Sequence, residues 1–238
     1  MNIALIGYGK MGKAIEKAAL KRGHQISLII DLENKEDLNS ENLKMIDVAI
    51  EFTTPHTAFE NVSFCLQQQT PIVCGSTGWL QHLEDAKTIA AKNNTGLIVA
   101  SNFSIGVNLF FELNKKLAGL MQNHPEYNVG MTEIHHTAKK DAPSGTAISL
   151  AEQILENYPL KKKWVNHLSE NPAELSIISE RVDPAPGTHV VRYTSPIDDI
   201  EITHTAHNRE GFAEGAVLAA EFLKGKAGFF GMKEVLGL

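Results

Sequence analysis

The chain has little cysteine, no long apolar run and no excess of positive charge. Only Cys65 and Cys74 occur in 238 residues, both in apolar segments without C-x-x-C spacing, so reduced core residues are expected rather than a disulfide or zinc pair. No segment approaches the ~18 consecutive apolar residues of a membrane span. The amino terminus lacks the basic region and cleavage site of a signal peptide. A formal net charge of −6 disfavours nucleic-acid and membrane partners, so we expect a cytoplasmic globular protein.

The first half of the chain alternates apolar strand patterns with helical stripes. Strands are predicted at Met1–Ile6, Gln25–Ile30, Asp47–Phe52, Pro71–Cys74 and Gly96–Ala100. Thr54-Pro55 has the pattern of an N-cap followed by proline in the first turn, so a helix is predicted to begin there. Near-continuous apolar strands, each followed by a helix, predict an α/β domain with a parallel sheet covered on both faces.

The second half has a different pattern. Helical stripes predict a long helix around residues 107–120 and further helices at Ser144–Tyr158 and Gly211–Leu223. Strand-like runs occur at Asn128–His136, Glu174–Val182, His189–Ser195 and Ile200–Ala206, with turns at DPAPG (183–187) and SPIDD (195–199). This pattern predicts an α+β domain with an open mixed sheet and helices on one face.

A glycine-rich turn follows the first strand. GYGKMG fits G-x-G-x-x-G, opens a helix, and is followed by Asp31 at the end of the next strand, which together favour a Rossmann-type dinucleotide site. The helix N-terminus would hold the pyrophosphate, Asp31 the ribose hydroxyls, and three further strand-end turns the nicotinamide. The predicted cofactor-binding residues are Gly7, Tyr8, Gly9, Lys10, Met11, Gly12, Asp31, Phe52, Thr53, Gly75, Ser76, Thr77, Ala100, Ser101, Asn102 and Phe103.

The residue at position 31 also bears on the choice between NADH and NADPH. An acid there repels a 2′-phosphate and favours NADH, whereas Lys10 and Lys35 could neutralise such a phosphate. We expect NADH with some use of NADPH.

Titratable and turn-forming residues are most concentrated in EIHHTAKKDAPSGTA, residues 133–147. A strand delivers His135 and His136, Lys139 and Lys140 offer point charges to a carboxylate or phosphate, and Ser-Gly-Thr opens a helix that favours an anion. Histidine and lysine can also exchange a proton with a substrate. A solvated charged loop is the simpler interpretation, but beside a dinucleotide site the segment predicts hydride transfer to an anion with proton donation.

A metal site is not expected. Adjacent His135 and His136 point to opposite faces of a strand, so they form a poor chelating pair. His204 and His207 have no further partner at ligand spacing.

The same segment resembles the E-x-H-H-x-x-K-x-D-x-P-S-G-T-A signature of the 4-hydroxy-tetrahydrodipicolinate reductase (dihydrodipicolinate reductase) family of lysine and diaminopimelate biosynthesis. The likeness extends along the chain to Glu51–Pro55, Gly75–Gly78, Ser101–Asn108, Ile202–Ala216 and Gly228–Leu236. It implies a homotetramer. Residues 1–104 and 210–238 would form the dinucleotide-binding domain, and residues 105–209 the substrate-binding and oligomerisation domain.

The resemblance also implies roles for residues. His135 and Lys139 would be the catalytic acid residues, with Lys139 the expected proton donor. NAD(P)H would deliver hydride to C4 of (2S,4S)-4-hydroxy-2,3,4,5-tetrahydrodipicolinate, a small cyclic dicarboxylate, with loss of water to give tetrahydrodipicolinate. The substrate-binding residues would be His136, Lys139, Ser144, Gly145, Thr146 and Thr77, with Thr77 between cofactor and substrate.

Two departures from the family pattern concern cofactor preference. GYGKMG is shorter than the common G-x-x-G-R-M-G loop, and Leu32 follows Asp31 where several members have arginine. Two alternatives stay open at this point: another small imine or carbonyl dehydrogenase, and a non-catalytic NADH-binding sensor. Only the HH-x-x-K and SGT elements separate these alternatives from the reductase.

Overall fold

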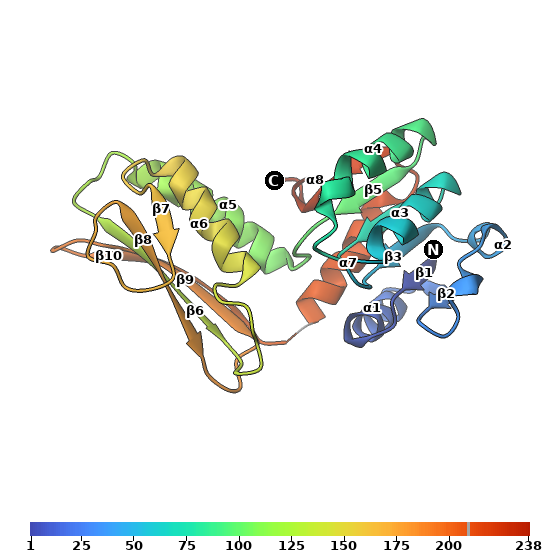
Figure 1. Ribbon diagram of the computed structural model, residues 1–238, viewed down its shortest axis with the longest axis horizontal. Coiled ribbons are helices and arrows are strands. Elements are labelled where there is room, and N and C mark those ends of the chain that lie inside the picture. The colour runs from blue at the N-terminus through green and yellow to red at the C-terminus, as the bar shows by residue number, and fades with distance from the viewer. Residues whose placement is uncertain (209) are drawn as a thin grey trace. The chain divides into compact units, whose positions relative to one another are not determined.

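The computed structural model describes residues 1–208 and 210–238, and the chain divides into two compact units (Figure 1). The first unit comprises Met1–Ile105 and Glu210–Leu238, and the second begins at Gly106 and ends before Glu210. Residue 209, where the sequence prediction ends the central domain, lies outside the described residues. Within the described chain, no helix is both long enough and apolar enough to cross a membrane.

The first unit is built on a six-stranded sheet in which every neighbouring pair is parallel. The strand order is β11-β5-β4-β3-β1-β2. The strands are β1 (Asn2–Ile6), β2 (Gln25–Ile30), β3 (Val48–Glu51), β4 (Ile72–Cys74), β5 (Gly96–Val99) and β11 (Gly228–Phe230). The order reverses at β1, since β2 lies on one side and β3, β4 and β5 on the other. The predicted Rossmann-type sheet is therefore confirmed.

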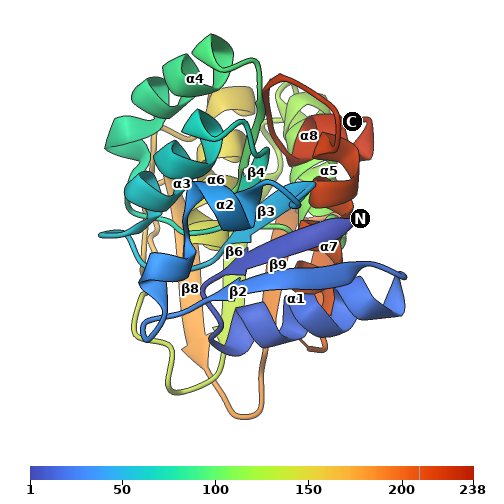
Figure 2. The same cartoon turned by 90° about the vertical axis from the view of Figure 1, so that its right-hand side faces the viewer.

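Helices cover both faces of this sheet (Figure 2). Along β1, Ile3 and Leu5 pack on one side and Ala4 and Ile6 on the other, because alternate side chains of a strand point to opposite faces. One face carries α1 (Lys10–Lys21), α7 (Glu210–Leu223) and α8 (Met232–Leu236), and the other α3 (Ala58–Gln67) and α4 (Leu83–Lys92). Short helices in the connections are η1 (Lys35–Asp37), α2 (Ser40–Leu43) and η2 (Leu80–His82).

Two features of this unit differ from the sequence prediction. The helix predicted to begin at Thr54-Pro55 begins at Ala58, because a turn comes first. In that turn the N–H groups of Thr57 and Ala58 both donate to the carbonyl of Thr54, at 3.2 and 3.0 Å. The sequence also does not predict β11, since its three residues are too few for a periodic pattern and its partner β5 lies far upstream.

The second unit is a five-stranded mixed sheet in the order β10-β9-β6-β8-β7. Its strands are β6 (Asn128–His135), β7 (Lys163–Val165), β8 (Glu174–Arg181), β9 (Gly187–Thr194) and β10 (Asp199–Ala206). The helices α5 (Ile105–Met121) and α6 (Gly145–Asn157) pack on one face through an apolar core. The open mixed sheet with helices on one face is thus confirmed. The sequence does not predict the short edge strand β7.

The central strand β6 separates β8 from β9. It pairs in parallel with β8 and antiparallel with β9, so the DPAPG connection spans β6 instead of forming a hairpin. The SPIDD turn does join a hairpin, β9 with β10. Residues on β8 and β9 are therefore brought to both sides of the strand that carries His135.

Candidate active site

The glycine-rich turn connects β1 to α1 through two tight contacts. Gly7 has φ +96°, and a Cβ there would lie 2.2 Å from the carbonyl oxygen of Phe52. A Cβ on Gly12 would lie 2.2 Å from the carbonyl oxygen of Gly7. Only glycine fits at both positions, and the helix can therefore begin close to the end of the sheet. Gly9 is the N-cap of α1 and has no side chain to occupy the first N–H groups, which suits a phosphate.

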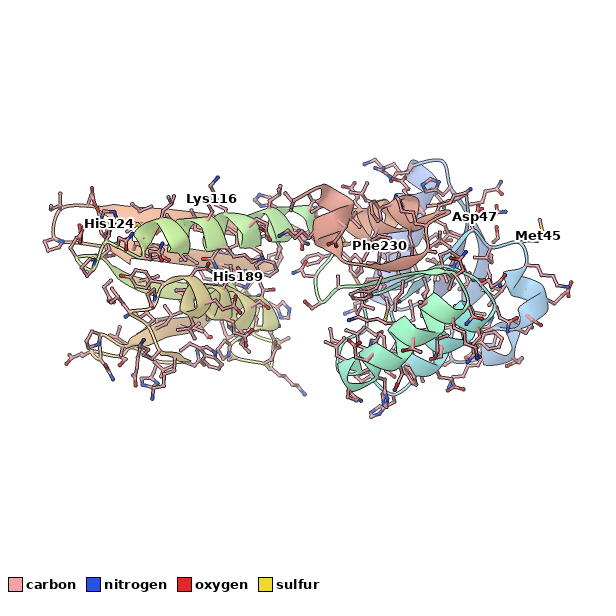
Figure 3. The ribbon with its side chains drawn as sticks, turned by 90° about the horizontal axis from the view of Figure 1, so that it is seen from above. Met45, Asp47, Lys116, His124, His189 and Phe230 are labelled. Atoms are coloured by element: carbon pink, nitrogen blue, oxygen red, sulfur yellow. The ribbon has the colours of Figure 1, made fainter. Side chains whose placement is uncertain are left out.

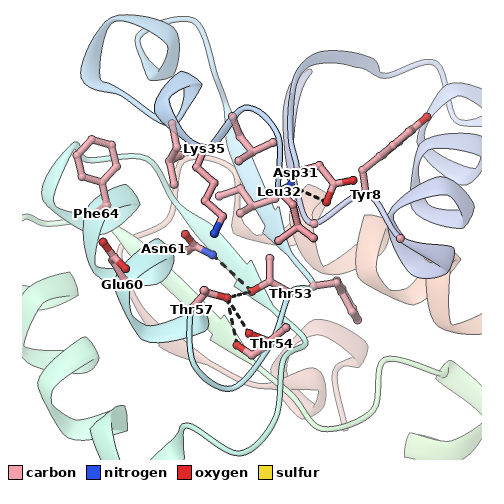
Figure 4. Close-up of a pocket in the computed structure, with 16 residues that line it drawn as sticks. Tyr8, Asp31, Leu32, Lys35, Thr53, Thr54, Thr57, Glu60, Asn61 and Phe64 are labelled. Carbon is pink, nitrogen blue, oxygen red and sulfur yellow. Dashed lines mark hydrogen bonds between the residues drawn. The ribbon is translucent and has the colours of Figure 1, made fainter.

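A cavity of about 510 Å³ lies beyond the carboxyl ends of β1, β2 and β3 (Figure 4). The predicted cofactor residues that line it are Gly7, Tyr8, Gly9, Asp31, Phe52 and Thr53. Other lining residues, which the sequence analysis did not assign to the cofactor, include Leu38, Thr54, Thr57, Glu60, Asn61 and Phe64. Lys10, Met11 and Gly12 at the start of α1, and the loops at residues 75–77 and 100–103, do not line this cavity.

The loops that follow β3, β4 and β5 nevertheless meet. A Cβ on Gly75 would lie 2.2 Å from the ring of Phe52, and the rings of Phe52 and Phe103 have their centroids 5.6 Å apart. Thr77 is exposed in the loop after β4. The three predicted strand-end turns thus lie at one edge of the sheet, as the parallel topology requires.

Asp31 and Lys35 bring opposite charges to the cavity. The Asp31 carboxylate accepts the N–H of Leu32 at 2.9 Å, and the Asp31 N–H donates to the side chain of Asn34 at 2.8 Å. These local hydrogen bonds fix the orientation of the Asp31 carboxylate. The Lys35 side chain extends into the same space, toward Asn61 and Thr53 (Figure 4).

Glu51 is a fully buried carboxylate that the sequence analysis did not single out. At the end of β3 its Oε1 accepts the Thr53 N–H at 2.9 Å and the Ser76 hydroxyl at 3.1 Å. Its Oε2 accepts the Cys74 thiol at 2.9 Å. Burial and the nearby Glu51 carboxylate both raise the pKa of Cys74, which keeps the thiol protonated. Glu51 therefore ties together the two loops that carry Thr53 and Ser76.

In the second unit, the helix-covered face of the sheet changes from apolar to polar toward the end of β6. Val129 and Met131 belong to the apolar core, whereas Glu133 and His135 are buried on the same face. Glu133 lies between Ser179 of β8 and His189 of β9, and His135 is paired with Arg181 of β8. The polar residues of three strands are thus gathered beside the start of α6.

Glu133 anchors the first residue of the SGT segment. The Ser144 N–H donates to both of its carboxylate oxygens at 3.1 Å, and Nη2 of Arg181 lies 3.3 Å from Oε1. Burial acts to raise the pKa of Glu133, but hydrogen bonds from Ser144 and Ser179 outweigh it and hold that pKa below its ordinary value. The carboxylate is therefore charged at neutral pH.

His135 and His189 form a buried pair beside this carboxylate. Their rings lie edge to face with centroids 5.1 Å apart. His189, which is labelled in Figure 3, has its Nε2 3.2 Å from the hydroxyl of Ser144, the N-cap of α6. Burial lowers the pKa of both histidines, for His189 to about 4, so both rings are neutral at pH 7. Nδ1 of each ring has no hydrogen-bond partner among the described residues.

The same group has the composition of a metal site. Glu133, His135 and His189 place three potential ligand atoms within 4.8 Å of one another, which sequence spacing could not reveal because His189 lies on a separate strand. The Glu133 oxygens already accept hydrogen bonds from Ser144 and Arg181, and the guanidinium charge opposes a cation there. This geometry favours a hydrogen-bonded network, and the expected absence of a metal stays a prediction.

The segment after β6 carries the other predicted residues. His136 and Lys139 are half-buried and Lys140 is exposed. Lys139 Nζ donates to both carboxylate oxygens of Asp141 at 2.8 Å. This pair shows that the ammonium group can hold a carboxylate through both oxygens.

The Ser-Gly-Thr residues begin α6. Ser144 is buried as the N-cap, and its hydroxyl accepts the N–H of Ala147 at 3.2 Å. Gly145 is exposed and Thr146 is half-buried. The second unit thus gathers His135 and Ser144 around Glu133, with Lys139 connected to them through Arg181.

The chain is similar to known proteins along nearly its whole length. Residues 1–103 and 106–236 match the family models described as dihydrodipicolinate reductase, N-terminus and C-terminus. The 4-hydroxy-tetrahydrodipicolinate reductase of Christiangramia forsetii is 52% identical over 99% of this chain and 98% of its own. That of Methanoregula boonei is 33% identical over 82% and 76%.

A solved structure gives the same result. The dipicolinate-bound dihydrodipicolinate reductase from Paenisporosarcina sp. TG-14 has a TM-score of 0.78 and 26% identity, and the match covers 98% of both chains. The chain therefore belongs to the dihydrodipicolinate reductase family and is an oxidoreductase whose Rossmann-type unit serves a nicotinamide cofactor.

Proposed function

We propose that the protein reduces (2S,4S)-4-hydroxy-2,3,4,5-tetrahydrodipicolinate to tetrahydrodipicolinate with NAD(P)H, in lysine and diaminopimelate biosynthesis. The observation that carries this proposal is the gathering of His135, Lys139 and the start of α6 at the polar end of one sheet, in a chain of this family. One hydride and one proton enter the substrate, and its C4 hydroxyl leaves as water.

We assign proton transfer to Lys139 and His135. A bound nicotinamide cofactor supplies the hydride that C4 receives. The Lys139 ammonium is the proton donor in this proposal, because it carries a proton beside a carboxylate-binding position. His135 is neutral at pH 7, since burial lowers its pKa, so it can accept a proton before it returns one.

We assign the substrate carboxylates to five residues of the second unit, His136, Lys139, Ser144, Gly145 and Thr146, and we place Thr77 between cofactor and substrate. Support comes from the N-terminus of α6, whose dipole favours negative charge where Gly145 is exposed. The contact of Lys139 with both oxygens of Asp141 is the geometry that a substrate carboxylate would adopt in its place. In this conformation Ser144 supports the helix start, since both its N–H and its hydroxyl are engaged within the protein.

For the cofactor we propose NADH with some use of NADPH. Asp31 at the cavity would accept ribose hydroxyls and repel a 2′-phosphate, while Lys35 offsets part of that repulsion. Asp31→Ala should lower the ratio of kcat/KM for NADH to kcat/KM for NADPH by about tenfold. A tenfold change corresponds to a difference of roughly 1.4 kcal/mol in binding free energy. Glu33→Ala is the matched control, because Glu33 is an exposed acid two residues away that does not line the cavity. An unchanged ratio in Asp31→Ala would show that this residue does not read the ribose.

The remaining assignments rest on the family. We propose that the first unit binds the dinucleotide, that the second binds substrate and forms a homotetramer, and that the protein is cytoplasmic. Light scattering after gel filtration tests the tetramer.

The function is tested by oxidation of NADH or NADPH with 4-hydroxy-tetrahydrodipicolinate generated in a coupled assay. Lys139→Ala should lower turnover about 10²–10⁴-fold, because it removes the proton donor. Lys140→Ala is the control, since this neighbouring lysine is exposed. Near-wild-type turnover in Lys139→Ala would refute the assignment.

Two other outcomes point to the alternatives. Activity with an amino-acid imine but not with this substrate would indicate another imine dehydrogenase. A non-catalytic sensor would bind NADH without oxidising it, and its NADH complex would not bind pyridine-2,6-dicarboxylate, a planar product-like analogue.

A further inference from the structure

Arg181, the last residue of β8, contacts the buried Glu133 and two backbone carbonyls of the segment that carries Lys139. Its Nη2 donates to the carbonyl of Asp141 at 2.7 Å and lies 3.3 Å from Oε1 of Glu133. Its Nε donates to the carbonyl of Lys139 at 3.3 Å. The side chain is only 20% exposed, so these contacts are partly shielded from water. Arg181 therefore holds the backbone on both sides of residue 140, in the segment that carries Lys139.

Glu133 extends this connection to the helix. Its carboxylate is completely buried and receives the Ser144 N–H on both oxygens as well as the Arg181 guanidinium. Ser144 is the N-cap of α6, so the position of Glu133 determines where the anion-binding end of that helix begins. A buried charge of this kind needs its partners, because an unpaired carboxylate away from water is strongly unfavourable.

We propose that the Glu133–Arg181 pair is the positioning unit of the site. Arg181 holds the Lys139 segment through two carbonyls, and Glu133 holds both Arg181 and the start of α6. The pair thereby sets the distance between the Lys139 ammonium and the helix end that binds the substrate carboxylate. This inference rests on the proposed function and adds a residue that touches neither substrate nor cofactor in its assigned role.

The chemistry of arginine explains why this residue type is required. The planar guanidinium presents five donors in fixed directions, which lets one side chain serve a carboxylate and two carbonyls at once. A lysine carries its charge on a single nitrogen and cannot satisfy three acceptors that lie on different sides. Lysine at position 181 should therefore preserve the charge beside Glu133 while losing the hold on the segment.

The test compares Arg181→Ala and Arg181→Lys with the wild type as full-length proteins. Five quantities are measured: kcat, KM for 4-hydroxy-tetrahydrodipicolinate, the Kd of pyridine-2,6-dicarboxylate, the Kd of NADH, and amide hydrogen exchange of residues 136–146. Arg192→Ala is the matched control. Arg192 lies on β9 of the same sheet and pairs with Glu201 of β10, so its loss removes an arginine ion pair elsewhere in the sheet.

In Arg181→Ala we expect kcat to fall by up to about 10²-fold, since misplacement by about an ångström has effects of this size. Dicarboxylate binding should weaken and exchange in residues 136–146 should accelerate, while the Kd for NADH stays at the wild-type value. Millimolar guanidinium should restore part of the activity of Arg181→Ala, because it can refill the space between the same acceptors. It should not restore Lys139→Ala, which lacks the proton donor itself.

Wild-type exchange and dicarboxylate affinity in Arg181→Ala would overturn the proposal. If Arg181→Ala does not fold, Arg181→Lys decides, because it retains the charge beside Glu133, and wild-type values there would equally refute the positioning role. If the wild-type protein does not reduce the substrate, the proposed function fails. Hydrogen exchange of residues 136–146 still decides the positioning role in that case, since it requires no turnover.

Discussion

The buried imidazole of His189 should make the stability of this protein fall on mild acidification. Burial and the neighbouring His135 lower the pKa of His189 from 6.5 to about 4 in the folded chain. The unfolded chain keeps the ordinary value and therefore binds a proton at a higher pH than the folded chain does. The stabilisation that neutral His189 contributes is therefore fully present above pH 6.5, and it is lost as the pH falls from 6.5 toward about 4.

The size of this loss follows from the width of the window. Over each pH unit in which His189 is protonated only in the unfolded chain, the free energy of unfolding falls by about 1.4 kcal/mol. The complete window therefore corresponds to a loss of about 3 kcal/mol. That is a large part of the roughly 5–15 kcal/mol that stabilises an ordinary domain. His135 adds to the effect in the same direction, since burial lowers its pKa as well.

The assay is urea unfolding of the wild type and of His189→Gln between about pH 7.5 and about pH 4, with His167→Gln as the control at an exposed histidine. Glutamine cannot take up a proton, so the loss of stability across this range should shrink by about 3 kcal/mol in His189→Gln. The smaller contribution of His135 should remain. Equal pH dependence in the wild type and in His189→Gln would refute the reasoning.

Two further predictions concern local packing. Gly215→Ala should destabilise the protein by about 1–3 kcal/mol, because the new Cβ would lie 1.8 Å from the carbonyl oxygen of Phe103. Gly119→Ala is the control, because no atom other than its chain neighbours and the backbone of its own helix lies within 4 Å of the new Cβ. It should be neutral or stabilising by up to ~1 kcal/mol, and a lower melting temperature for Gly119→Ala would contradict the packing argument. Ser144→Ala should lower the free energy of unfolding, measured in urea, by about 1 kcal/mol, because α6 loses its N-cap. It should also weaken the binding of pyridine-2,6-dicarboxylate. Unchanged values of both quantities would show that the cap is dispensable.

The Rossmann-type fold of the first unit was predictable because its signals are local in sequence. GYGKMG and Asp31 lie within one β-α-β unit, and the tight contact of Gly12 with Gly7 shows why the glycine spacing identifies the turn. The cavity residues Glu60 and Asn61 could not be found in this way, since they lie on α3 without any recurring pattern. The buried Glu51 was also missed, because a carboxylate at a strand end has no distinctive spacing.

The sequence by itself determined the two kinds of sheet, the glycine-rich turn and the segment from His135 to Thr146, since periodicity and short motifs act between residues close in the chain. Only the tertiary structure decided which partners this segment has. The placement of β6 between β8 and β9 brings Arg181 and His189 to opposite sides of Glu133, although both lie far from Glu133 in sequence. The strand order β10-β9-β6-β8-β7 depends on how the whole sheet packs against α5 and α6, and no short motif encodes it.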